Sequence, residues 1–132
     1  MTTLEIEESE QINLQFEKRD GILPVAVQET SSGQILMIAS INREAFDYSI
    51  KNKVAAFYST SRKTFWVKGE TSGNYVKLDK ILIDCDQDAL VFKVTLIKGG
   101  VCHTYNKNGT NRKACFYRSI NTELQTLEFL EK

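Results

Sequence analysis

The sequence predicts a mainly β protein of the α+β class, with two or three short helices in one compact sheet or barrel-like domain. Several short runs alternate apolar and polar residues, and the run at 90–96 is the clearest. Clusters of turn-forming residues, such as 29–33, separate these runs. The length of 132 residues suffices for one hydrophobic core but hardly for two, so we expect a single domain over 1–132.

The first half of the chain is predicted to form a hairpin followed by a helix. Residues 22–27 form the first strand, with Pro24 at a sheet edge or at the start of the strand. The returning strand covers residues 34–39. Asn42 is a good N-cap for a short helix over residues 43–51. The first fifteen residues form an N-terminal extension for which the sequence predicts no definite structure.

The second half is predicted to be mostly strands. These strands cover residues 54–59, 64–67, 75–83, 90–97 and 114–118. The apolar positions change phase around Asp79-Lys80, which indicates a β-bulge. Asn121 then favours a C-terminal helix over about residues 121–131. The apolar stripe of this expected helix is Leu124, Leu127 and Leu130.

Composition excludes several classes of protein. Hydrophobic residues make up 42% and charged residues 26%, which is ordinary for a globular domain. The 17 basic residues equal the 17 acidic ones, which argues against a nucleic-acid binder. No apolar run is long enough to span a membrane, and the acidic N-terminus lacks the core of a signal peptide. We therefore expect a cytoplasmic protein whose thiols stay reduced.

Three alternating carboxylates, Asp84, Asp86 and Asp88, are candidate magnesium ligands because magnesium favours carboxylate oxygen. In a straight strand the outer two would lie roughly 13 Å apart, too far for one ion. The hypothesis therefore requires the segment to bend between its two flanking strands. The alternative is a solvated acidic turn.

The three cysteines, Cys85, Cys102 and Cys115, are candidate zinc ligands. Three protein ligands are typical of a catalytic zinc that keeps one position for water. The alternative is that all three are small buried hydrophobic residues, since no C-x-x-C pair occurs. His103, the only histidine, is the candidate general base, and its alternative role is that of a hydrogen-bonded structural imidazole.

A glycine-bounded loop and nearby basic residues suggest substrate binding. The loop, residues 69–73, offers backbone donors and two hydroxyls suited to phosphate, although such a loop on its own is more often just a hairpin turn. Trp66 could stack on a base, or it could belong to the core. The candidate substrate contacts are Arg62, Trp66, Lys68, Thr71 and Ser72.

Taken together, these motifs resemble the phosphoribosyl-AMP cyclohydrolase family of histidine biosynthesis. The resemblance covers about residues 16–119. The matching runs are Asp20-Gly21-Ile22-Leu23-Pro24, Ser59-Thr60-Ser61-Arg62, Trp66-Val67-Lys68-Gly69-Glu70-Thr71-Ser72-Gly73, Asp84-Cys85-Asp86-Gln87-Asp88, Cys102-His103-Thr104 and Cys115-Phe116-Tyr117-Arg118. The family hydrolyses the N1–C6 bond of adenine by means of zinc and also binds magnesium.

The resemblance implies a role for each candidate ligand. It makes Cys85, Cys102 and Cys115 the zinc ligands, and Asp84, Asp86 and Asp88 the magnesium ligands. The family is an intertwined homodimer, so Cys85 of one subunit would join Cys102 and Cys115 of the other. We expect a zinc-activated water to attack C6 of the substrate, with His103 as the proton shuttle. The alternative function is a non-catalytic, zinc-stabilised β module that binds nucleotides or a protein partner.

One stretch departs from the family pattern. The family usually has six residues between its last two cysteines, whereas this chain has twelve, residues 103–114. The insertion contains Asn108-Gly109, a strong hairpin-turn signal. We expect a loop that bulges out and returns, so that Cys102 and Cys115 keep their places. A longer closed loop adds little entropic cost.

Overall fold

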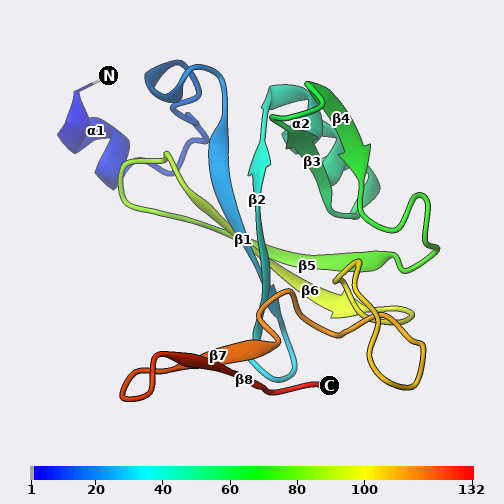
Figure 1. Cartoon of the computed structure of the whole chain (residues 1–132). Helices are drawn as coiled ribbons and strands as arrows, with labels where there is room; N and C mark the ends of the chain where they lie inside the picture. Colours follow the sequence, from blue (N-terminus) through cyan, green and yellow to red (C-terminus); the bar gives the residue numbers. More distant parts are fainter. Residues whose placement is uncertain (1) are drawn as a thin grey trace.

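A four-stranded sheet forms the centre of the computed structural model, which describes residues 2–132 (Figure 1). The strands lie in the order β2-β1-β6-β5. β1 is antiparallel to β2 and parallel to β6, and β6 is antiparallel to β5. Their bounds are β1 Leu23–Glu29, β2 Ile35–Ile41, β5 Val76–Ile83 and β6 Leu90–Leu96. The corresponding four predicted strands are confirmed to within a residue or two at their ends.

Details of the sheet follow from particular residues. Pro24 is the second residue of β1, and pairing with β6 begins only at Val25, so the prediction that Pro24 marks the start of a strand is confirmed. The register of β5 against β6 shifts between Leu78 and Lys80, which confirms the predicted bulge. β2 and β5 are the two edges of this sheet. The sheet is therefore open, and the residues from 2 to 132 form no closed barrel.

The helix α2, Arg43–Asn52, lies beside the hairpin of β3, Ala56–Ser59, and β4, Thr64–Val67. The Asn42 side chain accepts a hydrogen bond from the Ala45 N–H at 2.9 Å, as predicted for the N-cap. In this hairpin Phe57 is fully buried. Its ring centroid lies 5.0 Å from that of Trp66 and 6.0 Å from that of Phe92 on β6. These rings join the small hairpin to the main sheet.

The N-terminal extension contains α1, Thr3–Glu8, followed by the short 3-10 helix η1, Glu17–Arg19. Thr2 and Glu5 cap α1 reciprocally, because each side chain accepts the other's backbone N–H. With α2 these make two α-helices within residues 2–132. Neither of the two has the length and apolar character that a membrane crossing requires.

The predicted C-terminal helix, residues 121–131, is wrong. The segment forms an antiparallel hairpin of β7, Arg118–Asn121, and β8, Thr126–Phe129, and the strand predicted at 114–118 begins only at its last residue. Asn121 Oδ1 does accept the backbone N–H groups of Glu123 and Leu124, as an N-cap would. Gln125 then takes a left-handed backbone, φ +56°, and the chain reverses. The same local hydrogen bonds serve a turn as well as a helix start.

Candidate metal and substrate site

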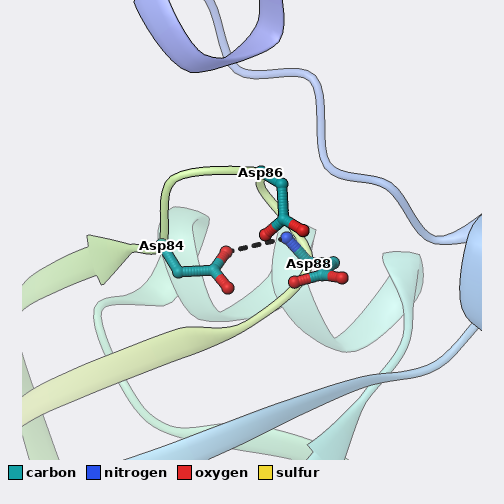
Figure 2. A group of neighbouring side chains, drawn as sticks. All are labelled: Asp84, Asp86 and Asp88. Atoms are coloured by element: carbon teal, nitrogen blue, oxygen red, sulfur yellow. Dashed lines mark hydrogen bonds between the residues drawn. The ribbon is translucent and has the colours of Figure 1, made fainter. Parts of the chain in front are cut away.

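The acidic loop, residues 84–88, bends between β5 and β6 and gathers its three carboxylates (Figure 2). Asp84 Oδ1 accepts hydrogen bonds from the N–H groups of Asp88 at 2.9 Å and Ala89 at 3.1 Å. Gln87 takes a left-handed backbone, φ +58°. Oxygens of Asp84, Asp86 and Asp88 consequently lie within 4.8 Å of one another. The bend that one-ion binding would require is therefore present.

Two basic residues of η1 neutralise this loop. Lys18 Nζ lies 3.1 Å from Oδ2 of both Asp86 and Asp88, and Arg19 Nη2 lies 2.9 Å from Asp88 Oδ2. Burial opposes the ionisation of Asp88, but its hydrogen bonds, including those from Lys18 and Arg19, outweigh burial and hold its pKa below the usual range. Burial together with the Asp88 carboxyl raises the pKa of Asp84. Asp88 thus stays ionised because two cationic side chains contact its carboxylate.

Gln87 ties the N-terminal extension to the acidic loop. Its side chain is 4% exposed, with Nε2 donating to the carbonyls of Ile6 at 3.3 Å and Gln11 at 3.2 Å. Its Oε1 accepts the Asn13 N–H at 2.7 Å, and its carbonyl accepts the Gln15 N–H at 2.8 Å. Sequence reasoning missed Gln87, Lys18 and Arg19 as parts of this site. The only available signal was the adjacent basic pair at 18–19, and nothing nearby in the sequence links that pair to residues 86–88.

Cys102 and Cys115 lie together despite the insertion between them. The Val101 and Cys102 N–H groups donate to the carbonyls of Lys113 at 3.0 Å and Arg112 at 3.1 Å. This pairing returns the chain, so the expectation that the loop bulges out and comes back is confirmed. Cys102 is buried, whereas Cys115 is exposed. The pKa of the Cys115 thiol is raised to about 11, mainly because its sulfur is partly buried and in addition because Cys102 lies beside it.

Cys85 lies apart from this pair. It sits in the acidic loop before β6 begins, whereas Cys102 follows the end of β6. A strand of this length spans roughly 20 Å, and sulfurs on one zinc lie within about 5 Å of each other. Within the described part of one chain, the only group of three or more potential metal ligands is the acidic one.

The candidate substrate residues divide into two sets. Lys68 Nζ donates to the Val101 carbonyl and lies 5.9 Å from the centroid of the half-buried Trp66 ring. Burial lowers the pKa of Lys68, and the Cys115 and Cys102 thiols partly offset this effect. Lys68 and Trp66 therefore belong to the surroundings of the thiol pair. The second set, Arg62, Thr71 and Ser72, is exposed, and so is the candidate proton shuttle His103.

The loop after Lys68 is closed by the backbone. Gly69 has φ +88°, and a Cβ there would lie 2.4 Å from the Tyr75 nitrogen. Only glycine permits this approach. Ser72 Oγ accepts the Asn74 N–H at 3.2 Å, which leaves the Ser72 hydroxyl proton free for a ligand. The Thr71 and Ser72 side chains therefore stand on a fixed loop adjoining Lys68.

Comparisons with known proteins agree on one family. Residues 37–117 match the family model described as phosphoribosyl-AMP cyclohydrolase. A protein of that name from Chlorobium chlorochromatii is 44% identical over 112 residues, covering 85% of this chain and 76% of its own length. Proteins of the same name from Desulfotalea psychrophila and Cenarchaeum symbiosum are 41% and 42% identical. They cover 83% and 81% of this chain, and 82% and 93% of their own lengths.

Proposed function

The chain belongs to the phosphoribosyl-AMP cyclohydrolase family, and from this premise we propose that it hydrolyses the N1–C6 bond of the adenine ring of phosphoribosyl-AMP in histidine biosynthesis. The observation that carries the proposal is the pairing of Cys102 and Cys115 beside the Lys68 ammonium, all within the matched segment. The free thiols also favour a reducing, cytoplasmic setting.

The chemistry of the two donor sets fits two different metals. Cys102, Cys115 and a Cys85 from a second subunit would hold zinc through thiolate sulfur. Zinc bound there would supply the Lewis acidity that activates the attacking water. The acidic loop fits magnesium, because its oxygens already lie within 4.8 Å, close to the span of about 4 Å across one such ion. Lys18 occupies the loop as a stand-in cation.

The remaining residues would bind the substrate and move protons. His103, which directly follows Cys102, would take a proton from the water as it attacks C6 and deliver one to N1 as the N1–C6 bond breaks. The ribosyl group on N1 makes the ring electron-poor and C6 more electrophilic. Trp66 would stack on the base beside Lys68. The contacts proposed for the anionic groups are Arg62, Lys68, Thr71 and Ser72.

The separation of the thiols supports a homodimer. Cys85 stands one strand length from Cys102, so three sulfur ligands can meet only if a second copy supplies Cys85. Thr104 Oγ1, 3.0 Å from Cys102 Sγ, gives that sulfur a hydrogen-bond partner from its own chain. Such partners orient metal ligands and adjust their basicity.

The activity is tested with purified protein, zinc and phosphoribosyl-AMP, following the loss of adenine absorbance. Cys102→Ser should lose zinc and turnover together, because it removes a buried thiolate ligand. His103→Ala should keep its zinc and slow turnover by about a hundredfold or more, since it removes the acid–base group.

The control is Lys107→Ala, an exposed position in the same loop, which should behave as wild type. A zinc-free Cys102→Ser protein with full activity would contradict the proposal. A wild-type protein that binds zinc but leaves the adenine ring intact would instead indicate a non-catalytic module.

A further inference from the structure

The inserted loop, residues 103–114, packs against the last residues of the chain, and Glu131 makes most of the contacts. Glu131 Oε1 accepts the Lys113 N–H at 2.9 Å, and Oε2 accepts Asn106 Nδ2 at 3.0 Å. The Glu131 carbonyl accepts Arg112 Nε at 3.0 Å. One residue therefore holds both arms of the loop, since Asn106 lies on the outgoing arm and Lys113 on the returning arm.

The segment that carries Glu131 is itself fixed. The Leu130 N–H donates to the Tyr117 carbonyl at 2.7 Å, and the Tyr117 and Phe129 rings stack with centroids 6.0 Å apart. The Arg112 guanidinium lies 4.2 Å from the Tyr117 ring centroid, a cation–π contact. The hairpin of β7 and β8, which begins three residues after Cys115, thus leads directly into Glu131.

The contacts of Glu131 bear on the two thiols through the backbone. The Lys113 N–H binds Glu131, while the Lys113 carbonyl accepts the Val101 N–H, next to Cys102. Lys113 also stands two residues before Cys115. The two arms pass very close to each other at this point, which we call the crossing. A Cβ on Gly100 would lie 2.1 Å from the Arg112 carbonyl oxygen. The Cys115 N–H donates to the Leu36 carbonyl of β2 at 2.7 Å, whereas Cys102 is bound to Arg112 of the returning arm. A shift of the returning arm would therefore move Cys102 relative to Cys115.

Asn106 confers order on the far end of the loop. Its Oδ1 accepts the N–H groups of Asn108 at 3.0 Å and Thr110 at 3.1 Å, which closes the turn. Its Nδ2 is thereby aimed at Glu131. The insertion is thus a closed turn anchored at one carboxylate, and the C-terminal hairpin supplies the anchor.

We propose that Glu131 is a positioning residue that sets the separation of the Cys102 and Cys115 sulfurs by holding the inserted loop against the C-terminal hairpin. The inference rests on the proposed function only in regarding this thiol pair as metal ligands. Both the loop and the hairpin after residue 117 lie beyond what the family pattern accounts for: the loop is longer than the pattern, and the hairpin follows the matched segment.

The test uses a probe that needs neither zinc nor substrate. Phenylarsine oxide condenses with two adjacent thiols to form two As–S bonds and releases one water, so its affinity reports whether the pair is correctly spaced. Metal-free, full-length protein is titrated as wild type, Glu131→Gln and Glu131→Ala. The control is Glu128→Ala on the same hairpin, whose carboxylate binds only Asn121 within that hairpin, at 2.7 Å.

We expect the arsenical affinity to fall in the order wild type, Glu131→Gln, Glu131→Ala, because glutamine keeps one of the two acceptors. Zinc affinity, measured against a chromophoric chelator, should fall in the same order and by about tenfold for the alanine variant. The sulfur-to-cobalt absorption of the cobalt-substituted protein should change with it. Glu128→Ala should match wild type in all three measurements.

The inference is overturned if Glu131→Ala and Glu128→Ala give the same arsenical affinity. If Glu131→Ala does not fold, the same comparison is made between Glu131→Gln and Glu128→Ala, and equal arsenical affinities overturn the inference. Failure of the proposed function gives a different result, namely a graded arsenical response in a protein whose wild type does not open the adenine ring.

Discussion

At the scale of single residues, the acidic loop shows how basic side chains offset the repulsion among clustered carboxylates. Three carboxylates within 4.8 Å repel each other, and Lys18 and Arg19 offset that repulsion. The two cationic residues differ in role. The Arg19 guanidinium pairs with the buried Asp88, whereas the half-exposed Lys18 ammonium pairs with both Asp86 and Asp88. Lys18 is therefore the group that a divalent cation would displace.

Replacing Lys18 tests this competition. Lys18→Met should bind Mn²⁺, a probe for the magnesium site, about threefold to tenfold more tightly, because the ion no longer displaces an ammonium group that is half exposed. The measurement is titration of metal-free protein followed by the electron paramagnetic resonance of free Mn²⁺. Lys51→Met, at an exposed position near the end of α2, should match wild type. Equal or weaker binding by Lys18→Met would refute the competition.

At the scale of elements, the return of the chain from residue 112 to residue 102 decides where the thiols lie. Three backbone hydrogen bonds join the two arms at this crossing, from the N–H groups of Val101, Cys102 and Arg112, and Gly100 allows the arms to approach. The twelve-residue loop between Cys102 and Cys115 extends beyond the crossing, which agrees with the small entropic cost of lengthening a closed loop. The crossing thus brings the backbone next to the two thiols together at the base of the loop.

Gly100→Ala should separate the arms. Its Cβ would lie 2.1 Å from the Arg112 carbonyl oxygen, so the backbone must move. We expect zinc affinity to drop about tenfold and the free energy of unfolding to decrease by about 1–3 kcal/mol, as for other overpacked sites. Chelator competition and denaturant unfolding measure the two effects.

Gly109→Ala provides the contrast for that experiment. It strains a left-handed loop position, φ +82°, but a Cβ there meets nothing within 4 Å. We expect this variant to lose stability and to keep its zinc affinity. If Gly100→Ala also kept wild-type zinc affinity, the crossing would not be what spaces the sulfurs.

At the scale of the whole molecule, β6 separates the donor groups of the proposed zinc site. The acidic loop with Cys85 precedes the strand, and the Cys102 and Cys115 pair follows it. A symmetric pair of chains would contain two complete sites, each built from both copies. The mass of the protein in solution should therefore correspond to two chains. Metal analysis should give one zinc ion per chain.

Mixing two inactive variants tests the sharing directly. Cys85→Ser and Cys102→Ser should each lack zinc and activity alone. After subunit exchange about a quarter of the wild-type sites should return, because half of the dimers are mixed and each mixed dimer keeps one intact site. A double variant, Cys85→Ser with Cys102→Ser, mixed with either single variant is the control and should recover nothing. No recovery in the first mixture would mean that the ligands are not shared between subunits.

Sequence reasoning predicted well wherever the information was local. Alternation along residues 90–97, the phase change near Asp79 and the capping side chain of Asn42 each reflect contacts within a few positions or one strand pair. The C-terminal segment shows the limit of that approach. The Asn121 side chain accepts hydrogen bonds from the amides that follow it both at the start of a helix and in a turn. Whether the segment becomes a helix or a hairpin therefore depended on the pairing of residues 126–129 with residues 118–121 and not on the local pattern.

The sequence by itself determined the four strands of the main sheet, the donor types and the family, because residue type and short-range periodicity can be read directly from it. Only the tertiary structure decided which groups meet. Lys18 reaches Asp86 across 68 positions, and Glu131 holds Lys113 across 18. Such contacts depend on the path of the whole chain and on backbone turns such as that at Gln87. A local sequence pattern cannot specify that path, because the position of a distant residue depends on all the turns between the two contacting residues.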